Sequence, residues 1–187
     1  AILYGDMLRA GEEPRSTSLL LVGLLLAFAI VFGRATVITP PASRNIYEQQ
    51  YQMHRLATEF LPEPVAVNDL GFVSYQNDNY VLDLWGLGSE EARLHVRRGP
   101  DPQAAIARLT AETGVRWAMI YDDWFGTAVP PDWCRAGTLT TSAVTASQPV
   151  VSIYLIDPEL GPRLEAALTE ISPTLPDGAV LERTPCA

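Results

Sequence analysis

The chain has 187 residues, of which 48% are hydrophobic, and a formal net charge of −9 at pH 7. This length is sufficient for one domain with a buried core and an additional segment. The acidic balance excludes a basic surface of the kind that binds nucleic acid, and we expect no nucleic-acid partner.

A long apolar segment lies near the N-terminus. Residues 18–38 read SLLLVGLLLAFAIVFGRATVI and contain a single charge, Arg34. About 20 helical residues cross the hydrocarbon layer of a membrane, and an arginine near the end of the helix extends to the interface. We therefore predict a pre-membrane segment at 1–17, a transmembrane helix at 18–38 and the lipid bilayer as a partner. A cleaved signal peptide is the alternative, but the acidic residues that precede the segment are not typical of one.

Two cysteines, Cys134 and Cys186, are relevant to the side of the membrane on which the domain lies, because disulfides form in oxidising compartments outside the cytoplasm. A disulfide between them would close a loop of roughly 50 residues and add about 4 kcal/mol of stability, while two reduced thiols are the alternative. Basic residues flank the apolar segment equally, so they do not set its orientation. The acidic charge and the cysteine pair favour an extracytoplasmic domain at 42–187.

Helices and strands alternate after the apolar segment. Pro40 and Pro41 are expected to end the membrane helix, because proline lacks a backbone donor. A second helix is predicted over 43–61, with Tyr47 and Tyr51 on its apolar face. Its polar face is expected to be solvated and consists of Glu48, Gln49, Gln52, Arg55 and Glu59.

Short apolar runs that follow this helix are typical of buried strands. They lie at 65–67, 80–84 and 116–121, and helices are predicted at 89–96 and from 101 or 102 to 114. The order strand, connection, strand, helix, strand indicates a parallel sheet.

The last third predicts an antiparallel strand pair. An edge or outer strand is expected within 135–145, a hairpin turn at 146–149, a strong strand at 150–156 and a final helix at about 158–171. The predicted fold class is therefore α/β. The predicted chain consists of one N-terminal transmembrane helix and a small α/β domain. The layers of the domain resemble a three-layer arrangement. Its sheet is expected to be mostly parallel and to end in a C-terminal antiparallel strand pair.

Acidic residues follow three of the predicted strands. Asp69, Asp83 and Asp122 would lie along one rim, because parallel strands end at the same edge of a sheet and ligands bind beyond that edge. Such a rim suits a cation or sugar hydroxyls, whereas Asp69 and Asp83 can instead cap turns. No histidine or cysteine set has the spacing of metal ligands, so we predict no metal site.

Other side chains allow more than one interpretation. Five aromatic residues offer stacking surfaces for a sugar, lie at the lipid headgroup layer or pack in the core: Trp85, Trp124, Trp133, Tyr75 and Tyr121. His95, Arg97 and Arg98 either contact a phosphate or form a solvated basic patch. The sequence contains no nucleophile elbow, dinucleotide fingerprint or P-loop, and we predict no catalytic residue.

Residues 43–89 resemble the start of the soluble C-terminal domain of bacterial GT-C-type membrane glycosyltransferases, which include protein mannosyltransferases and lipid A aminoarabinose transferases. The residues that carry the resemblance are Gln50 and Met53, then Val67-Asn68-Asp69-Leu70-Gly71, then Leu82-Asp83-Leu84-Trp85-Gly86-Leu87. The resemblance continues loosely through 116–121, and beyond that only the general pattern matches.

The resemblance implies an enzyme of the cytoplasmic (inner) membrane that transfers a sugar from a polyprenyl phosphate to an acceptor outside the cytoplasm. The catalytic acids of that family, and any divalent metal, belong to an earlier loop that has no counterpart here, so no catalytic residue and no cofactor are carried over. We expect further membrane protein upstream of Ala1, and that transmembrane domain is a predicted partner.

The implied role of this domain is accessory: it covers the membrane-embedded active site or binds a glycan or lipid acceptor. The expected acceptor-binding residues are Asn68, Asp69, Asp83 and Trp85. One alternative is a non-enzymatic, single-pass membrane-anchored α/β module that binds an envelope glycan or a partner protein. Another is a scaffold without a small-molecule site.

Overall fold

A computed structural model describes residues 15–186, so most of the predicted pre-membrane segment lies outside the described residues. The chain divides into two compact units, Ala1–Pro41 and Ala42–Ala187.

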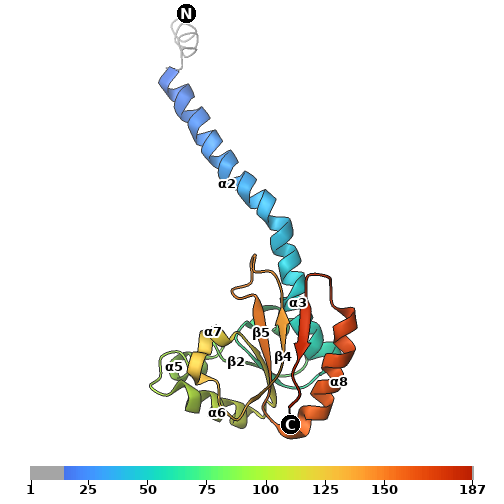
Figure 1. Cartoon of the computed structure of the whole chain (residues 1–187). Coiled ribbons are helices and arrows are strands. Elements are labelled where there is room, and N and C mark those ends of the chain that lie inside the picture. Colours follow the sequence, from blue (N-terminus) through green and yellow to red (C-terminus); the bar gives the residue numbers. More distant parts are fainter. Residues whose placement is uncertain (1–14, 187) are drawn as a thin grey trace, which may run out of the picture. The chain divides into compact units, whose positions relative to one another are not determined.

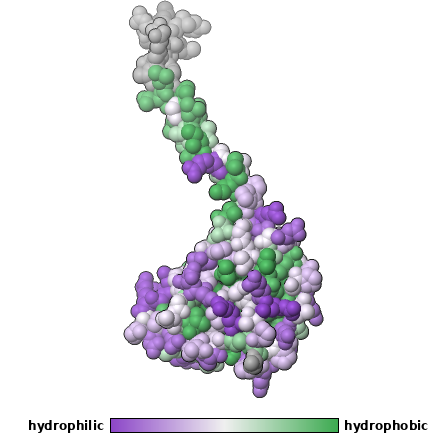
Figure 2. Space-filling view, viewed as in Figure 1, coloured by the Kyte–Doolittle hydropathy of each residue, from purple (hydrophilic) through white to green (hydrophobic). Residues whose placement is uncertain are grey.

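The apolar segment belongs to helix α2 (Arg15–Glu48). Its side chains are exposed along the segment, as for Leu19 (72%) and Val37 (77%), and Figure 2 shows them as an almost continuous hydrophobic surface. The hydroxyl of Thr36 donates to the carbonyl of Phe32 at 2.8 Å, so this polar group is satisfied within the helix. Among the described residues, one helix is long and apolar enough to cross a membrane, which suggests membrane anchoring.

Pro40 and Pro41 lie inside α2, so the prediction that they end the helix was wrong. A proline removes one backbone donor, but its fixed φ of about −65° is itself helical, and a helix can continue through it. The helical path is interrupted only at Gln49, where φ is −113° and ψ is −76°.

The sheet has six strands in the order β2-β1-β3-β5-β4-β6. β1 pairs in parallel with β2 and β3, and the remaining pairs are antiparallel, including the predicted hairpin of β4 and β5. The strands are β1 (Val65–Val67), β2 (Val81–Asp83), β3 (Trp117–Ile120), β4 (Cys134–Thr140), β5 (Val150–Leu155) and β6 (Val180–Arg183). The sheet is thus parallel in its first part and antiparallel in its C-terminal part.

One strand was not predicted. β6 pairs with β4 and forms the edge of the sheet, so β4 is an internal strand and the expectation of an edge or outer strand there was wrong. β6 has four residues, of which two are charged, and the sequence gives it no clear apolar alternation.

Helices cover both faces of the sheet, as the predicted three-layer arrangement requires, and Figure 1 shows α8 on one side with α5 and α6 on the other. The first face packs against α3 (Gln50–Arg55), the π-helical turn η1 (Leu56–Phe60), α4 (Leu70–Ser74) and α8 (Gly161–Ile171). The second packs against α5 (Glu90–His95) and α6 (Pro102–Thr113). Shorter turns are α7 (Asp122–Phe125), η2 (Gly126–Ala128), η3 (Pro158–Leu160) and η4 (Ser172–Thr174).

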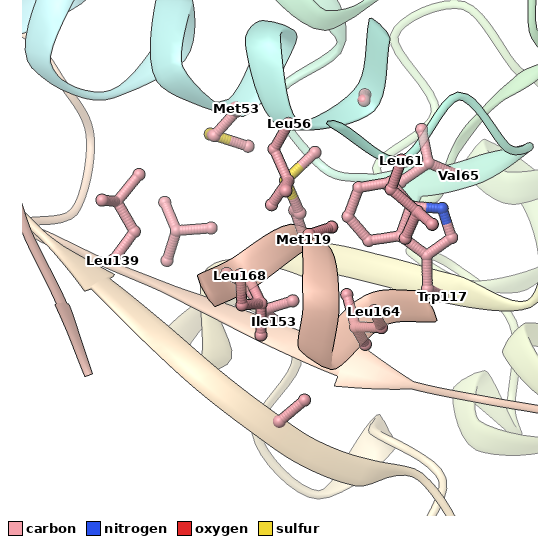
Figure 3. Close-up of a cluster of buried hydrophobic side chains, with 14 of the residues drawn as sticks. Met53, Leu56, Leu61, Val65, Trp117, Met119, Leu139, Ile153, Leu164 and Leu168 are labelled. Carbon is pink, nitrogen blue, oxygen red and sulfur yellow. The ribbon is translucent and has the colours of Figure 1, made fainter. Parts of the chain in front are cut away.

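The core of the first face is continuous from α3 to α8. Figure 3 shows Met53 and Leu56 above the sheet residue Met119, with Leu164 and Leu168 of α8 in the same cluster. All five side chains are at most 3% exposed. Burying each of them contributes on the order of 2 kcal/mol relative to exposure.

The predicted boundaries of α5 and α6, the two helices on the second face of the sheet, are confirmed by the residues that cap them. Asp101 accepts the backbone N–H of Ala104 at the start of α6, and Gly114 ends that helix with φ +68°. Ser89 accepts the N–H of Ala92 at the start of α5.

Cys134 and Cys186 form a disulfide that joins the start of β4 to the segment after β6. Their Cα atoms are 5.9 Å apart and their sequence separation is 52 residues. The bond therefore ties the edge strand β6 covalently to the strand with which it pairs.

Candidate functional site

The carboxyl ends of β1, β2 and β3 meet at one edge of the sheet, which we call the rim. Asn68 and Asp69 follow β1, Asp83 ends β2 and Asp122 follows β3, as predicted. The connections from β1 and β2 leave to opposite faces, since α4 joins the first core cluster and α5 joins the second. Such a divergence is where open α/β sheets bind ligands.

Asp83 is bonded to the turn that follows it. Its carboxylate accepts four backbone N–H groups: those of Trp85 at 2.9 Å, Gly86 at 3.0 Å, Gly88 at 2.5 Å and Ser89 at 3.2 Å. The residue is 3% exposed. Asp83 thus has the geometry of a turn cap, and its carboxylate has little remaining capacity for a ligand.

Replacing Asp83 with alanine is expected to lower the free energy of unfolding by about 2–3 kcal/mol, because four backbone donors lose their acceptor. Denaturant unfolding of the whole chain measures the loss. Asp123→Ala is the matched control, since Asp123 neighbours the rim and accepts no hydrogen bond among the described residues. Equal stability of the two variants would contradict the capping role.

Asn68 and Asp69 belong to a buried polar network that crosses from β1 to α3. Asn68 accepts the backbone N–H of Tyr121 at 2.8 Å. Asp69 accepts from the Gln50 amide at 3.2 Å and lies 3.3 Å from the hydroxyl of Tyr121, which also donates to Gln49 at 2.7 Å. Asp69 makes no cap to α4. Its carboxylate therefore joins α3 to the end of β3 instead of closing a turn.

Burial raises the pKa of Tyr121 above the ordinary range of tyrosine, and the nearby Asp69 carboxylate raises it further. Tyr121 thus remains a neutral hydrogen-bond donor at physiological pH. Two polar atoms of the network, Asn68 Nδ2 and Gln50 Oε1, are buried without a partner among the described residues. A donor and an acceptor of this kind are typical binding partners for a buried water molecule.

The polar face predicted for this helix was expected to be solvated; Glu59 is exposed as expected, but the expectation was wrong for Glu48, Gln49 and Gln52. Glu48, Gln49 and Gln52 are at most 3% exposed, and Asn45 is fully buried. Asn45, Gln49 and Gln52 recur at helical spacing, so they lie along one stripe beside the apolar residues Met53 and Leu56. This spacing indicates that the three amides share one face of the helix, but it does not show whether that face is buried.

Asn45 connects the end of α2 to the loop between β4 and β5. Its Oδ1 accepts the backbone N–H groups of Val144 at 3.2 Å, Thr145 at 2.8 Å and Ala146 at 2.8 Å, and its Nδ2 donates to the carbonyl of Ser142. Three donors and one acceptor of this loop thus depend on one amide side chain.

The predicted aromatic residues mostly pack within the domain. The rings of Trp85 and Trp124 have centroids 4.4 Å apart, and Trp133 lies 5.9 Å from Tyr154. Trp85 is only half-buried, and the guanidinium of Arg97 lies 4.5 Å from its ring centroid. Trp85 is thus a support for a cation at the rim.

Asp122 lies over the antiparallel part of the sheet. It accepts from Ser152 at 2.7 Å, from Tyr154 at 2.9 Å and from Arg135 at 3.2 Å. Burial, and then the hydrogen bond to Asp122, raise the pKa of Tyr154 to about 12. Asp122 is therefore engaged with β4 and β5 and does not complete a site with Asp69 and Asp83.

A separate group of aromatic residues lies on α2, α3 and α4 and just after α4. We call it the aromatic surface, and it consists of the exposed residues Tyr47, Phe72 and Tyr75 and the half-buried residues Tyr51 and His54. Consecutive ring centroids are 5.4 Å apart for Tyr47 and Tyr51, 5.6 Å for Tyr51 and Phe72 and 6.1 Å for Phe72 and Tyr75. Tyr47 is 51% exposed, Phe72 37% and Tyr75 59%.

The sequence placed Tyr47 and Tyr51 on the apolar face of their helix, but they lie beside the buried stripe of amides. The two stripes run along the same helix at the same spacing, so periodicity alone does not tell which one is buried. Contiguous exposed aromatic rings are typical of binding surfaces.

The rim and the aromatic surface differ in the side chains that they present to solvent. Within residues 15–186, no group of three or more histidine, cysteine, aspartate or glutamate side chains is placed to hold a metal ion. The rim acids are bonded to the protein itself, whereas the aromatic surface presents open rings. The structure thus combines hydrogen-bonded acids at the rim with exposed aromatic rings on the adjacent helices.

Comparisons with known proteins gave one match. A search of curated proteins and a search of solved structures found none. The family model described as "Domain of unknown function (DUF8728)" matches residues 44–154, which is more than half of the 187 residues. The match begins after the apolar segment, includes the rim, both helical stripes and β4, and ends within β5. The chain therefore belongs to the DUF8728 family.

Proposed function

We propose that this chain is the membrane-anchored accessory part of a larger GT-C-type glycosyltransferase, whose extracytoplasmic domain binds the acceptor. The support comes from the apolar helix, which suits a membrane, and from the sequence resemblance in residues 43–89. In this proposal the domain lies outside the cytoplasmic membrane and acts beside an upstream transmembrane domain.

The aromatic surface is the observation that carries the proposed role. Its rings offer apolar faces, and the hydroxyls of Tyr47 and Tyr75 form no hydrogen bond among the described residues. Rings with an apolar body and a free polar tip suit the alternating apolar and hydroxyl surfaces of a sugar. Two of the residues predicted to bind the acceptor, Asn68 and Asp83, are buried and hydrogen-bonded within the domain. The other two, Asp69 and Trp85, are only partly accessible to solvent.

The test is a transfer assay on the natural full-length membrane protein with a polyprenyl-phosphate sugar as donor. Tyr47→Ala and Tyr75→Ala together are expected to raise the acceptor KM roughly thirtyfold, because each ring contributes on the order of 1 kcal/mol. Thermal stability is expected to change little, since both rings are more than half exposed.

Tyr80→Ala is the matched control. Tyr80 is 52% exposed, and no ring partner lies next to it among the described residues. An unchanged KM in the double variant would remove the aromatic surface from acceptor binding. Absence of any transfer by the full-length protein would overturn the enzyme proposal itself.

A single-pass, non-enzymatic binding module is the second candidate. The rings of the aromatic surface favour it, and they lie within residues 44–154, the part of the chain that the family model matches. In that case the aromatic surface binds an envelope glycan without any transfer. Retained glycan binding by a protein that transfers no sugar, with loss of binding in the Tyr47→Ala and Tyr75→Ala variant, would establish this candidate.

A further inference from the structure

Most arginines of the domain are paired with acids. Within residues 42–186, seven of the ten arginines lie within 4.0 Å of a carboxylate: Arg44, Arg55, Arg93, Arg108, Arg116, Arg135 and Arg163. Arg97, Arg98 and Arg183 are the exceptions in that part of the chain. In a chain of net charge −9, two adjacent arginines without an acid partner form an unusual local excess of positive charge.

The acids nearest in sequence are engaged elsewhere. Glu90 pairs with Arg93 at 3.1 Å, and Glu91 lies 4.0 Å from Arg108. Asp101 accepts the backbone N–H of Ala104 as the cap of α6. The charge of Arg97 and Arg98 is therefore not neutralised by their own segment.

The ring of Trp85 holds Arg97 in place. Its centroid is 4.5 Å from the guanidinium carbon, and the ring itself is packed against Trp124 and Phe125 at 4.4 and 5.9 Å. An arginine that lies over an aromatic ring keeps its in-plane N–H donors free. No acceptor for these donors is present within residues 15–186, and the side chain is exposed.

The backbone after α5 is also fixed. Val96 is 5% exposed, and the N–H of Arg97 donates to the carbonyl of Ala92 at 3.1 Å. A Cβ at Gly99 would lie 2.2 Å from the carbonyl oxygen of His95, so the chain turns back closely at that glycine. His95, Arg97 and Arg98 thus project from a short segment that is anchored on both sides, and all three are exposed.

We propose that Arg97, Arg98 and His95 form a binding site for a phosphate group. Guanidinium groups bind phosphate through paired N–H donors, and a preorganised arginine loses less side-chain entropy on binding. The phosphate can belong to a soluble phosphorylated molecule or to a lipid headgroup. The site is independent of the acceptor role proposed above, because it shares no residue with the aromatic surface.

The experiment measures the rate at which phenylglyoxal modifies each arginine of the whole chain in phosphatidylcholine nanodiscs. Peptide mass spectrometry separates the sites, and Arg183 is the internal control because it also lacks an acid partner and is exposed. Inorganic phosphate or pyrophosphate at about four times its Kd is expected to slow modification of Arg97 and Arg98 about fivefold and to leave Arg183 unchanged.

A second arm replaces part of the phosphatidylcholine with phosphatidylglycerol and omits phosphate. Protection in this arm alone assigns the site to a lipid headgroup, whereas protection only by phosphate or pyrophosphate assigns it to a soluble ligand. The Arg97→Gln variant is expected to lose protection at Arg98, while Arg183→Gln retains it. Absence of protection in both arms, or equal protection of Arg183, would overturn the proposal.

Discussion

Replacing Asn45 with alanine is expected to destabilise the domain by about 3 kcal/mol. The side chain is fully buried and accepts from Val144, Thr145 and Ala146, so its removal leaves several polar groups of the loop without partners. Each unsatisfied buried group costs about 1–3 kcal/mol, and partial access of water to the loop limits the sum. For a domain of this size the melting temperature would fall by roughly 6–12 °C.

The loss has a local signature. The amides of residues 144–146 are expected to lose protection from hydrogen exchange before the strands do, because their shared acceptor is gone. Ser43→Ala is the matched control: Ser43 lies two residues earlier in α2, is exposed and forms no side-chain hydrogen bond among the described residues. Unchanged exchange at 144–146 in Asn45→Ala would show that the loop does not depend on this amide.

Removal of the disulfide is expected to cost about 4 kcal/mol. The bond between Cys134 and Cys186 closes a loop of 52 residues, and the chain-entropy model gives a loss of this size when such a loop is opened. β6 should respond first, since it pairs only with β4 among the described strands and the bond holds the segment that follows it. Denaturant unfolding of Cys134→Ser with Cys186→Ser measures the change.

A reducing agent provides the control for this experiment. It is expected to lower the stability of the wild-type chain to that of the double serine variant and to have no effect on the variant. A wild-type chain whose unfolding is insensitive to reductant would show that the bond does not contribute to stability. Faster exchange of the β6 amides in the variant would place the loss at the edge of the sheet.

The parts of the fold that the sequence predicted are those encoded by short-range patterns. Val65–Val67 and Trp117–Ile120 are continuous apolar runs, and both are buried strands of the parallel part. Asp101 and Gly114 delimit α6 because caps act on the adjacent turn. Such signals do not depend on what the segment packs against.

The polar network could not be predicted in the same way. Gln49 and Asn45 are hydrophilic, and a helical stripe of amides is ordinarily solvated. Their partners in the hairpin lie about a hundred positions later in the sequence, as the bond from Gln49 to the carbonyl of Gln148 shows. The sequence alone does not show which of these donors forms a hydrogen bond with which acceptor, because the pairing depends on the tertiary fold.

The candidate site was also predictable where short-range patterns define it and unpredictable where it depends on tertiary contacts. Each of three predicted strands is followed by polar residues, and this pattern correctly predicted that Asn68, Asp69, Asp83 and Asp122 lie at one edge of the sheet. The hydrogen bonds that each carboxylate accepts depend on the path of the backbone that follows it. Asp83 accepts four backbone N–H groups from one turn, and the sequence did not reveal the shape of that turn. The exposure of Tyr47 depends likewise on which stripe of its helix meets the sheet.

The bonds of Asn45 also bear on the order in which the chain is completed. During synthesis the apolar segment and the end of α2 emerge first, whereas residues 142–146 follow only after about a hundred further residues have been added. Until then the side-chain amide of Asn45 has only water as a partner. A nascent chain that stops before the β4–β5 loop would thus leave this amide, which is fully buried in the complete domain, exposed to solvent.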